Sequence, residues 1–117
     1  MAPPTASRLR SLRRKSGLTQ KEVASIVGLP NYFQLRRHEI GTSIPPLSIA
    51  MRYSILYQEP ISEIFPGLYG DEREKLESGI DEFEERLHQG SAKDPGANRT
   101  ARKLEWLHMR KNEFEIE

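Results

Sequence analysis

Five side chains able to read DNA bases lie within one short stretch of the sequence, YFQLRR. If this stretch is a helix with Leu35 turned inward, its outer face carries an aromatic ring and two guanidinium groups, with further polar groups at the flanks. Arg matches the acceptor pair of guanine, Gln pairs with adenine, and an aromatic ring packs on the thymine methyl group. The residues for which this pattern predicts major-groove contact are Tyr32, Phe33, Gln34, Arg36 and Arg37.

No comparable pattern suggests catalysis or metal binding. The histidines, His38, His88 and His108, are far apart in the sequence, and none has a partner at the spacing of a metal site. The glycines form no phosphate-binding motif, and the clustered carboxylates suit a solvated face. We therefore expect no enzyme, no catalytic residue, no metal and no cofactor.

Two short helices joined by a turn, between Thr19 and Gly41, would position the base-reading face. Thr19 followed three residues later by Glu22 is a capping box, which satisfies the free amides of a helix's first turn. Gly28 suits the left-handed residue that ends a helix, and Asn31 can cap the next one. This order of signals predicts a helix-turn-helix.

The composition indicates a small domain, or a small domain with an extension. The chain has 117 residues, of which 30% are charged, and no cysteine, which excludes disulfides and thiolate zinc sites. Its start, MAPPTASRLR, lacks the apolar stretch of a signal peptide, and no run reaches the roughly 18 apolar residues of a membrane span. We expect a cytoplasmic protein without a membrane partner.

Charge is strongly segregated along the chain. Residues 1–58 hold nine Lys or Arg against two Asp or Glu, whereas residues 71–90 hold three against eight. A basic front suits phosphate contact, because each neutralised phosphate releases condensed counterions. The acidic stretch would repel DNA, so we expect it to face solvent or a partner.

Residues 6–69 resemble the phage-repressor and Cro-like helix-turn-helix family, also called the Xre type. The resemblance lies in LRSLRRKSGLTQKEVASIVGL at residues 9–29, in Glu39 and Gly41, and in PPLSIAMRYSILYQEPISEIF at residues 45–65. It implies a five-helix DNA-binding domain in a small, dimeric transcriptional regulator.

The resemblance also implies roles for single residues. In the family pattern an Arg and a Glu at the positions of Arg13 and Glu39 form an ion pair that ties two helices together. Gln20 stands where family members contact a phosphate or a neighbouring base from the start of the second helix. His38 stands where the family usually has an inward aromatic or aliphatic residue, which implies that it faces the core. The hydroxyl groups of Thr42 and Ser43 are further candidates for phosphate contact.

The chain departs from the family pattern in the turn before the recognition helix. This turn is one residue longer, with Pro30 near the position of the usual capping Ser or Thr, and Asn31 takes over the cap. The extra residue leaves two alternatives open for Tyr32 and Phe33, which are contact with DNA and packing in the core.

Prolines and apolar spacing delimit the rest of the front domain. Residues 1–5 are expected to form a disordered lead. The first helix is expected to begin at Thr5 or Ser7 and to end at Ser16. Two further helices are expected at residues 47–57 and 61–65, the last ending at Pro66-Gly67. The inward stripe expected for the middle one of these helices is Leu47, Ala50, Met51 and Ser54.

Residues 70–117 are expected to form a helical extension for oligomerisation or partner binding, with a hinge at about 90–98. Its first helix is expected to begin at Asp71 and to carry an apolar stripe on an otherwise charged surface. Packing on the front domain, pairing with a second copy and docking of another protein remain alternatives for this stripe. The residues of the stripe are Leu76, Ile80, Phe83 and Leu87.

The last predicted helix is apolar on more than one side. Leu104, Leu107 and Phe114 face one way, whereas Trp106 and Met109 lie on another side. We therefore expect this helix to have contacts on both sides.

The sequence thus predicts an all-α protein, in which a five-helix repressor-like domain at residues 6–69 is followed by two additional helices. The expected function is sequence-specific binding of double-stranded DNA, as a dimeric repressor on an inverted-repeat operator. The alternative is an antitoxin-type or other protein-binding regulator whose C-terminal helices dock a partner protein.

Overall fold

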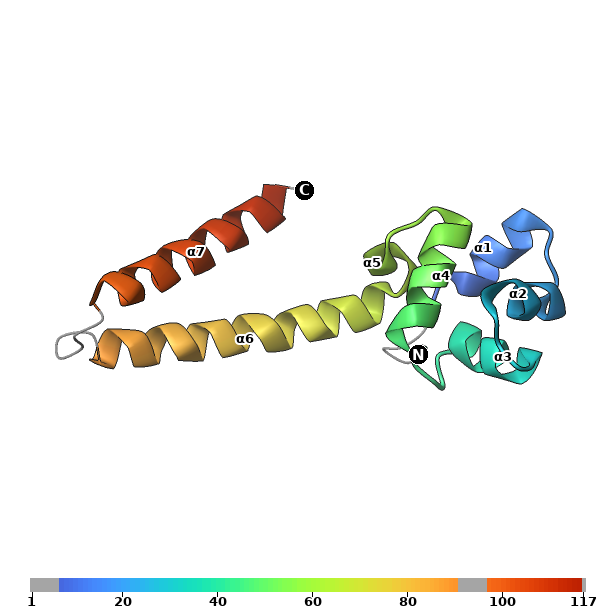
Figure 1. The fold of residues 1–117 in the computed structure, drawn as a ribbon, viewed down its shortest axis with the longest axis horizontal. Helices are drawn as coiled ribbons and strands as arrows, with labels where there is room; N and C mark the ends of the chain where they lie inside the picture. The colour runs from blue at the N-terminus through green and yellow to red at the C-terminus, as the bar shows by residue number, and fades with distance from the viewer. Residues whose placement is uncertain (1–6, 91–96, 117) are drawn as a thin grey trace. The chain divides into compact units, whose positions relative to one another are not determined.

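The structure, a computed structural model, describes residues 7–90 and 97–116, and all regular structure in these ranges is α-helical. The fold-class prediction is confirmed in this coarse form. Residues 1–5 and the centre of the expected hinge lie outside the described residues. The helices are α1 (Leu9–Ser16), α2 (Gln20–Val27), α3 (Tyr32–Ile40), α4 (Leu47–Tyr57), α5 (Ile61–Ile64), α6 (Pro66–Gly90) and α7 (Ala97–Ile116) (Figure 1).

Local capping signals fix the ends of α2 and the start of α3. The Glu22 amide donates to Thr19 Oγ1 over 3.1 Å, and the Thr19 amide donates to Glu22 Oε1 over 2.8 Å, which completes the capping box. Gly28 ends α2 at φ 84°, and Asn31 Oδ1 then accepts the amides of residues 33 and 34. These caps define the turn between the two helices.

The chain divides into two compact units, Met1–Arg73 and Glu74–Glu117, and α6 contributes residues to both. One core serves the first unit, and α2 packs chiefly against α3 within it. Helices α1 to α5 all contribute residues to this core or its border, so α3 packs against the same core as the other four helices. The buried core residues are Leu9, Leu12, Val23, Ala24, Val27, Leu35, Ile49, Tyr53, Ile64 and Phe65.

Helix α4 is rotated relative to the sequence-based expectation. Of the expected inward stripe, Ala50 is buried and Ser54 is half-buried, but Leu47 and Met51 are 71% and 51% exposed. Ile49 and Tyr53 take the buried positions instead. The prediction was wrong because α4 is apolar on both faces, so that spacing alone does not choose the inner one.

The start of α6 also differs from the expectation. Pro66 and Gly67 were expected to end the preceding helix, with the next one starting at Asp71, but α6 begins at Pro66. Proline lacks the amide hydrogen that the first helical residue leaves unpaired anyway, and its fixed φ suits this position. The Tyr69 amide donates to the Phe65 carbonyl over 2.9 Å, so the helical bonding already starts there.

The second unit contains the rest of α6 together with α7. The Arg110 Nη2 donates to Glu77 Oε1 over 3.1 Å and so joins the two helices. Ile80 and Thr100 are buried. Of the expected α6 stripe, Phe83 and Leu87 are half-buried and Leu76 is exposed.

The two sides of α7 differ in burial, whereas contacts on both sides were expected. Phe114 lies outside the residues whose side chains the structure describes. Leu104 and Leu107 are half-buried, whereas Trp106 and Met109 are 60% and 46% exposed. No helix in the described ranges is long and apolar enough to cross a membrane.

Candidate nucleic-acid interface

The outer face of α3 presents one aromatic and two cationic side chains. Leu35 is fully buried, and Phe33, Arg36 and Arg37 are exposed, with Phe33 at 54%. Gln34 is exposed at the flank of this face. Within the described part of the chain neither guanidinium group forms a hydrogen bond or an ion pair, so both are available to an external acceptor.

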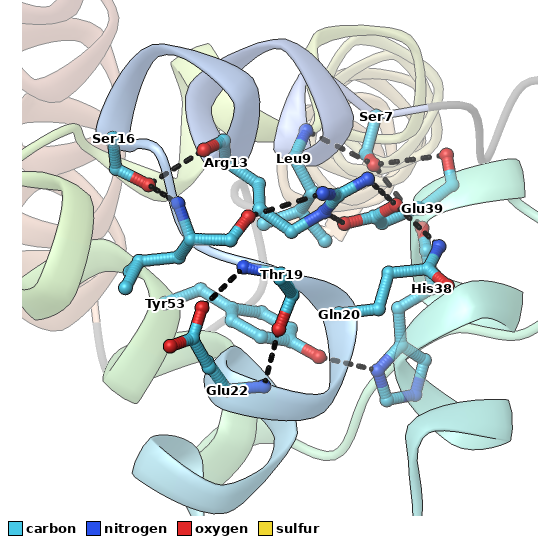
Figure 2. A network of polar contacts seen from close by, with 11 residues as sticks. Ser7, Leu9, Arg13, Ser16, Thr19, Gln20, Glu22, His38, Glu39 and Tyr53 are labelled. Atoms are coloured by element: carbon cyan, nitrogen blue, oxygen red, sulfur yellow. Dashed lines mark hydrogen bonds and ion pairs between the residues drawn. The ribbon is translucent and has the colours of Figure 1, made fainter.

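A buried ion pair joins the C-terminal end of α3 to α1. Arg13 Nε donates to Glu39 Oε2 over 2.7 Å, and Arg13 Nη2 donates to Glu39 Oε1 over 3.3 Å (Figure 2). The two side chains are 14% and 2% exposed. The hydrogen bond to Glu39 raises the pKa of Arg13, and Arg13 Nη1 also donates to the Leu18 carbonyl over 3.2 Å. The expected pair is therefore brought together with bidentate geometry.

Gln20 joins the same network from the start of α2. Its Nε2 donates to Glu39 Oε1 over 3.1 Å, and its side chain is half-buried. Figure 2 shows Gln20 pointing toward Glu39 rather than away from the bundle. Gln20 thus ties α2 to α3, and its amide nitrogen is already engaged before any phosphate is present.

The two aromatic residues whose roles were left open lie in different environments. Tyr32 is half-buried and packs against the core, whereas Phe33 is exposed. Their rings stack with centroids 4.3 Å apart and an interplanar angle of 27°. Lys21 Nζ lies 5.7 Å from the centre of the Tyr32 ring, within the range of a cation–π contact. The Tyr32 ring therefore packs against both the core and the Phe33 ring.

A basic groove runs beside the exposed face of α3. It has a volume of about 760 Å³ and is formed by α1, the start of α2 and α3. Its cationic lining comes from all three helices, with Arg10, Lys21 and Arg36 exposed. Such a concentration of positive charge attracts phosphate groups. Arg10 and Lys21 were missed by the sequence analysis, and only the basic balance of residues 1–58 pointed toward them.

The loop after α3 holds the remaining candidates for phosphate contact. Gly41 ends α3 at φ 94°, and the Thr42 amide donates to the Arg37 carbonyl over 3.1 Å. Thr42 is exposed and Ser43 is half-buried. The loop follows α3 directly, so the two hydroxyl groups lie near the C-terminal end of α3.

A second buried contact fixes the C-terminal half of α3. His38 Nδ1 lies 2.8 Å from the hydroxyl oxygen of Tyr53 on α4, and both residues are buried. Burial lowers the pKa of His38 and raises the pKa of Tyr53. Ser7 Oγ donates to the His38 carbonyl over 3.1 Å (Figure 2). His38 thus lies in the core, and no local sequence signal could identify Tyr53 as its partner.

Comparison with family models, with curated proteins and with solved structures finds no match to this chain. Among the described residues, no group of three or more His, Cys, Asp or Glu side chains lies together in a way that could hold a metal ion.

Proposed function

We propose that this protein binds double-stranded DNA in a sequence-specific manner, inserting α3 into the major groove. In this proposal residues 6–69 form a five-helix repressor-like domain, and the protein acts as a dimeric transcriptional regulator, most simply a repressor on an inverted repeat. The observation that carries the proposal is the pair of exposed guanidinium groups of Arg36 and Arg37 beside Phe33.

Rigid support of this face favours base reading over loose electrostatic contact. Glu39 accepts hydrogen bonds from Arg13 of α1 and from Gln20 of α2, and His38 contacts Tyr53 of α4. Three helices therefore fix the rotation of α3 about its own axis. A fixed rotation lets a guanidinium group meet the two acceptors of guanine at the correct angle.

The basic groove supplies the second requirement, which is contact with phosphates. Arg10 and Lys21 stand beside the α3 face without belonging to it. Phosphate contacts set the register of a protein on the duplex, whereas base contacts set its sequence preference. We assign Arg10, Lys21, Thr42 and Ser43 to the phosphates and Phe33, Gln34, Arg36 and Arg37 to the bases.

Selection of bound sites from random duplexes tests this function with the intact chain. The expected result is a recurrent half-site that is repeated with two-fold symmetry. Arg37→Ala should cost roughly 1–3 kcal/mol on the preferred site and relax one base position. Arg102→Ala on α7 is the matched control, because Arg102 is exposed in the second unit. A selection without a motif, or an Arg37→Ala preference identical to wild type, contradicts the proposal.

Exposed apolar residues in the second unit favour one additional candidate function. Leu76, Trp106 and Met109 are 57%, 60% and 46% exposed, and an aromatic anchor of this kind is typical of protein-binding surfaces. In this candidate function, an antitoxin-type or other regulator, the C-terminal helices dock a partner protein. Co-purification of a defined heterocomplex that Trp106→Ala dissociates would support it.

A further inference from the structure

Phe33 is an exposed aromatic residue whose backbone and ring are both held in place. It is the second residue of α3, and its side chain is 54% exposed. Its amide donates to Asn31 Oδ1 over 3.1 Å, which fixes the backbone at the start of the helix. Its ring stacks on the ring of Tyr32, which is half-buried and packs against the core. The stack therefore restricts the orientation of a ring that stays more than half exposed.

The Phe33 ring can distinguish bases only through an apolar group. It has neither a hydrogen-bond donor nor an acceptor, so the amino, carbonyl and ring-nitrogen groups of the base edges offer it no partner. The apolar group that base pairs present in the major groove is the methyl group on C5 of thymine. 5-Methylcytosine carries the same methyl group on the same ring atom, although it pairs with guanine. A contact with this methyl group therefore separates 5-methylcytosine from cytosine as well as thymine from uracil.

The place of Phe33 on α3 separates its role from that of the two guanidinium groups. The N-terminal residues of a recognition helix are the ones that contact base edges in this type of docking. Arg36 and Arg37 follow Phe33 by three and four residues, so they lie one turn further along the same face. Their donors suit guanine. Phe33 therefore faces a different part of the site, where no charged group competes with its contact.

We propose that Phe33 contacts the C5 methyl group of the pyrimidine that faces it, so that methylation of a cytosine at this position strengthens binding. The inference rests on the proposed function, because it names the chemical group that one residue of α3 recognises. Tyr32 is a positioning residue in this inference, since its ring holds the Phe33 ring and contacts no base itself. Cytosine methylation would thus change the occupancy of a site without any change in its sequence.

Four duplexes that differ only at one pyrimidine test the inference with the intact chain. The position is the one at which Phe33→Ala relaxes the preference in a selection from random duplexes. It carries thymine, uracil, cytosine or 5-methylcytosine in turn. Loss of the methyl group should weaken binding roughly three- to fivefold, both from thymine to uracil and from 5-methylcytosine to cytosine, which is the effect of one buried methyl group. In Phe33→Ala both ratios should be close to one.

Three further variants separate the methyl contact from general effects on the fold. Tyr32→Leu removes the stacked ring and should lower both ratios, whereas Tyr32→Phe keeps the ring and should preserve them. Ile26→Ala is the matched control, because Ile26 is 57% exposed but lies on α2, and it should leave both ratios unchanged. Each ratio compares two duplexes with the same protein, so a loss of folded protein cancels.

Wild-type ratios of one for both pairs of duplexes would overturn the inference, and so would ratios that persist in Phe33→Ala. A methyl effect for thymine without one for cytosine would overturn the control by cytosine methylation. A Tyr32→Leu variant with wild-type ratios would remove the positioning role of Tyr32. If the selection yields a half-site but the methyl group has no effect, the inference fails and the proposed function stands. If the selection yields no motif, the function fails and the inference fails with it.

Discussion

Glu39 is the residue on which the placement of the exposed α3 face depends. Its carboxylate is almost completely removed from water, and it accepts hydrogen bonds from side chains of α1 and α2 while belonging to α3. A buried carboxylate without its cationic partner destabilises the folded state, because the charge is removed from water and no other charge or hydrogen bond replaces the lost hydration. The ion pair therefore determines geometry more than it adds to the net stability.

Removal of Arg13 should expose this dependence. In Arg13→Met the Glu39 carboxylate keeps only the Gln20 donor, and we expect a loss of about 3–5 kcal/mol in the free energy of unfolding. The double variant Arg13→Met with Glu39→Met should recover most of the loss, since no charge stays buried. Urea denaturation measures both. Arg14→Met is the control, because Arg14 is exposed on α1. A loss below about 1 kcal/mol would mean that the pair behaves as a solvated one.

The buried His38 should make stability depend on pH. Burial lowers the pKa of His38 in the folded protein, so the unfolded chain binds a proton at a higher pH than the folded one. Stability is therefore retained above a pH of about 6.5 and lost as the pH falls below it, with a slope of at most about 1.4 kcal/mol per pH unit.

His38→Gln tests this pH dependence by removing the titrating group. Denaturation curves between neutral and mildly acidic pH should show a smaller slope for this variant than for wild type. His108→Gln serves as the control, since His108 is exposed on α7. An equal slope in wild type and His38→Gln would refute the assignment.

At the scale of the helices, local signals predicted the ends of elements better than their orientation. The Thr19–Glu22 capping box and the glycine ends of α2 and α3 act within a few residues, so the sequence displays them directly. The bonds of Gln20 to Glu39 and of His38 to Tyr53 join residues far apart in the chain. No local pattern carries that information.

Helix α4 shows why orientation was harder to predict, and α6 shows a boundary for which the local signal was ambiguous. Helix α4 has apolar residues on two faces, and the face with Ile49 and Tyr53 is the buried one, where Tyr53 contacts His38 of α3. Pro66 is compatible with both the end of one helix and the first turn of the next. In each case the residue types are compatible with more than one arrangement.

The turn after α2 should be unusually sensitive to a methyl group. A Cβ at Gly28 would lie 2.9 Å from Arg52 Nη1, which itself donates to the Val27 carbonyl. Gly17 has a similar positive φ but nothing within 4 Å of its Cβ position. Gly17→Ala should therefore cost only the left-handed backbone strain of about 1–2 kcal/mol.

Gly28→Ala should cost about 1 kcal/mol more than Gly17→Ala, because Arg52 must also release a helix-end carbonyl. Urea denaturation of the two variants in parallel measures the difference. Equal costs would show that Arg52 moves aside freely.

At the scale of the whole chain, the two units differ in the sign of their net charge. Residues 1–73 hold ten Lys or Arg against six Asp or Glu, whereas residues 74–117 hold eight against eleven. The first unit thus carries a net positive charge and the second a net negative one. If the first unit binds DNA as proposed, the acidic second unit competes with phosphates for the same cationic groups.

The fragment of residues 1–73 should therefore bind a random-sequence duplex at least as tightly as the full chain. It keeps every residue of the core cluster, from Leu9 to Phe65, and the cationic residues beside α3. For both proteins the logarithm of the binding constant should fall linearly with the logarithm of the salt concentration, by about 0.9 for each phosphate neutralised. Equal slopes would place all phosphate contacts in the first unit. A fragment with weaker binding and a smaller slope would instead assign part of the contact to the basic residues of α7.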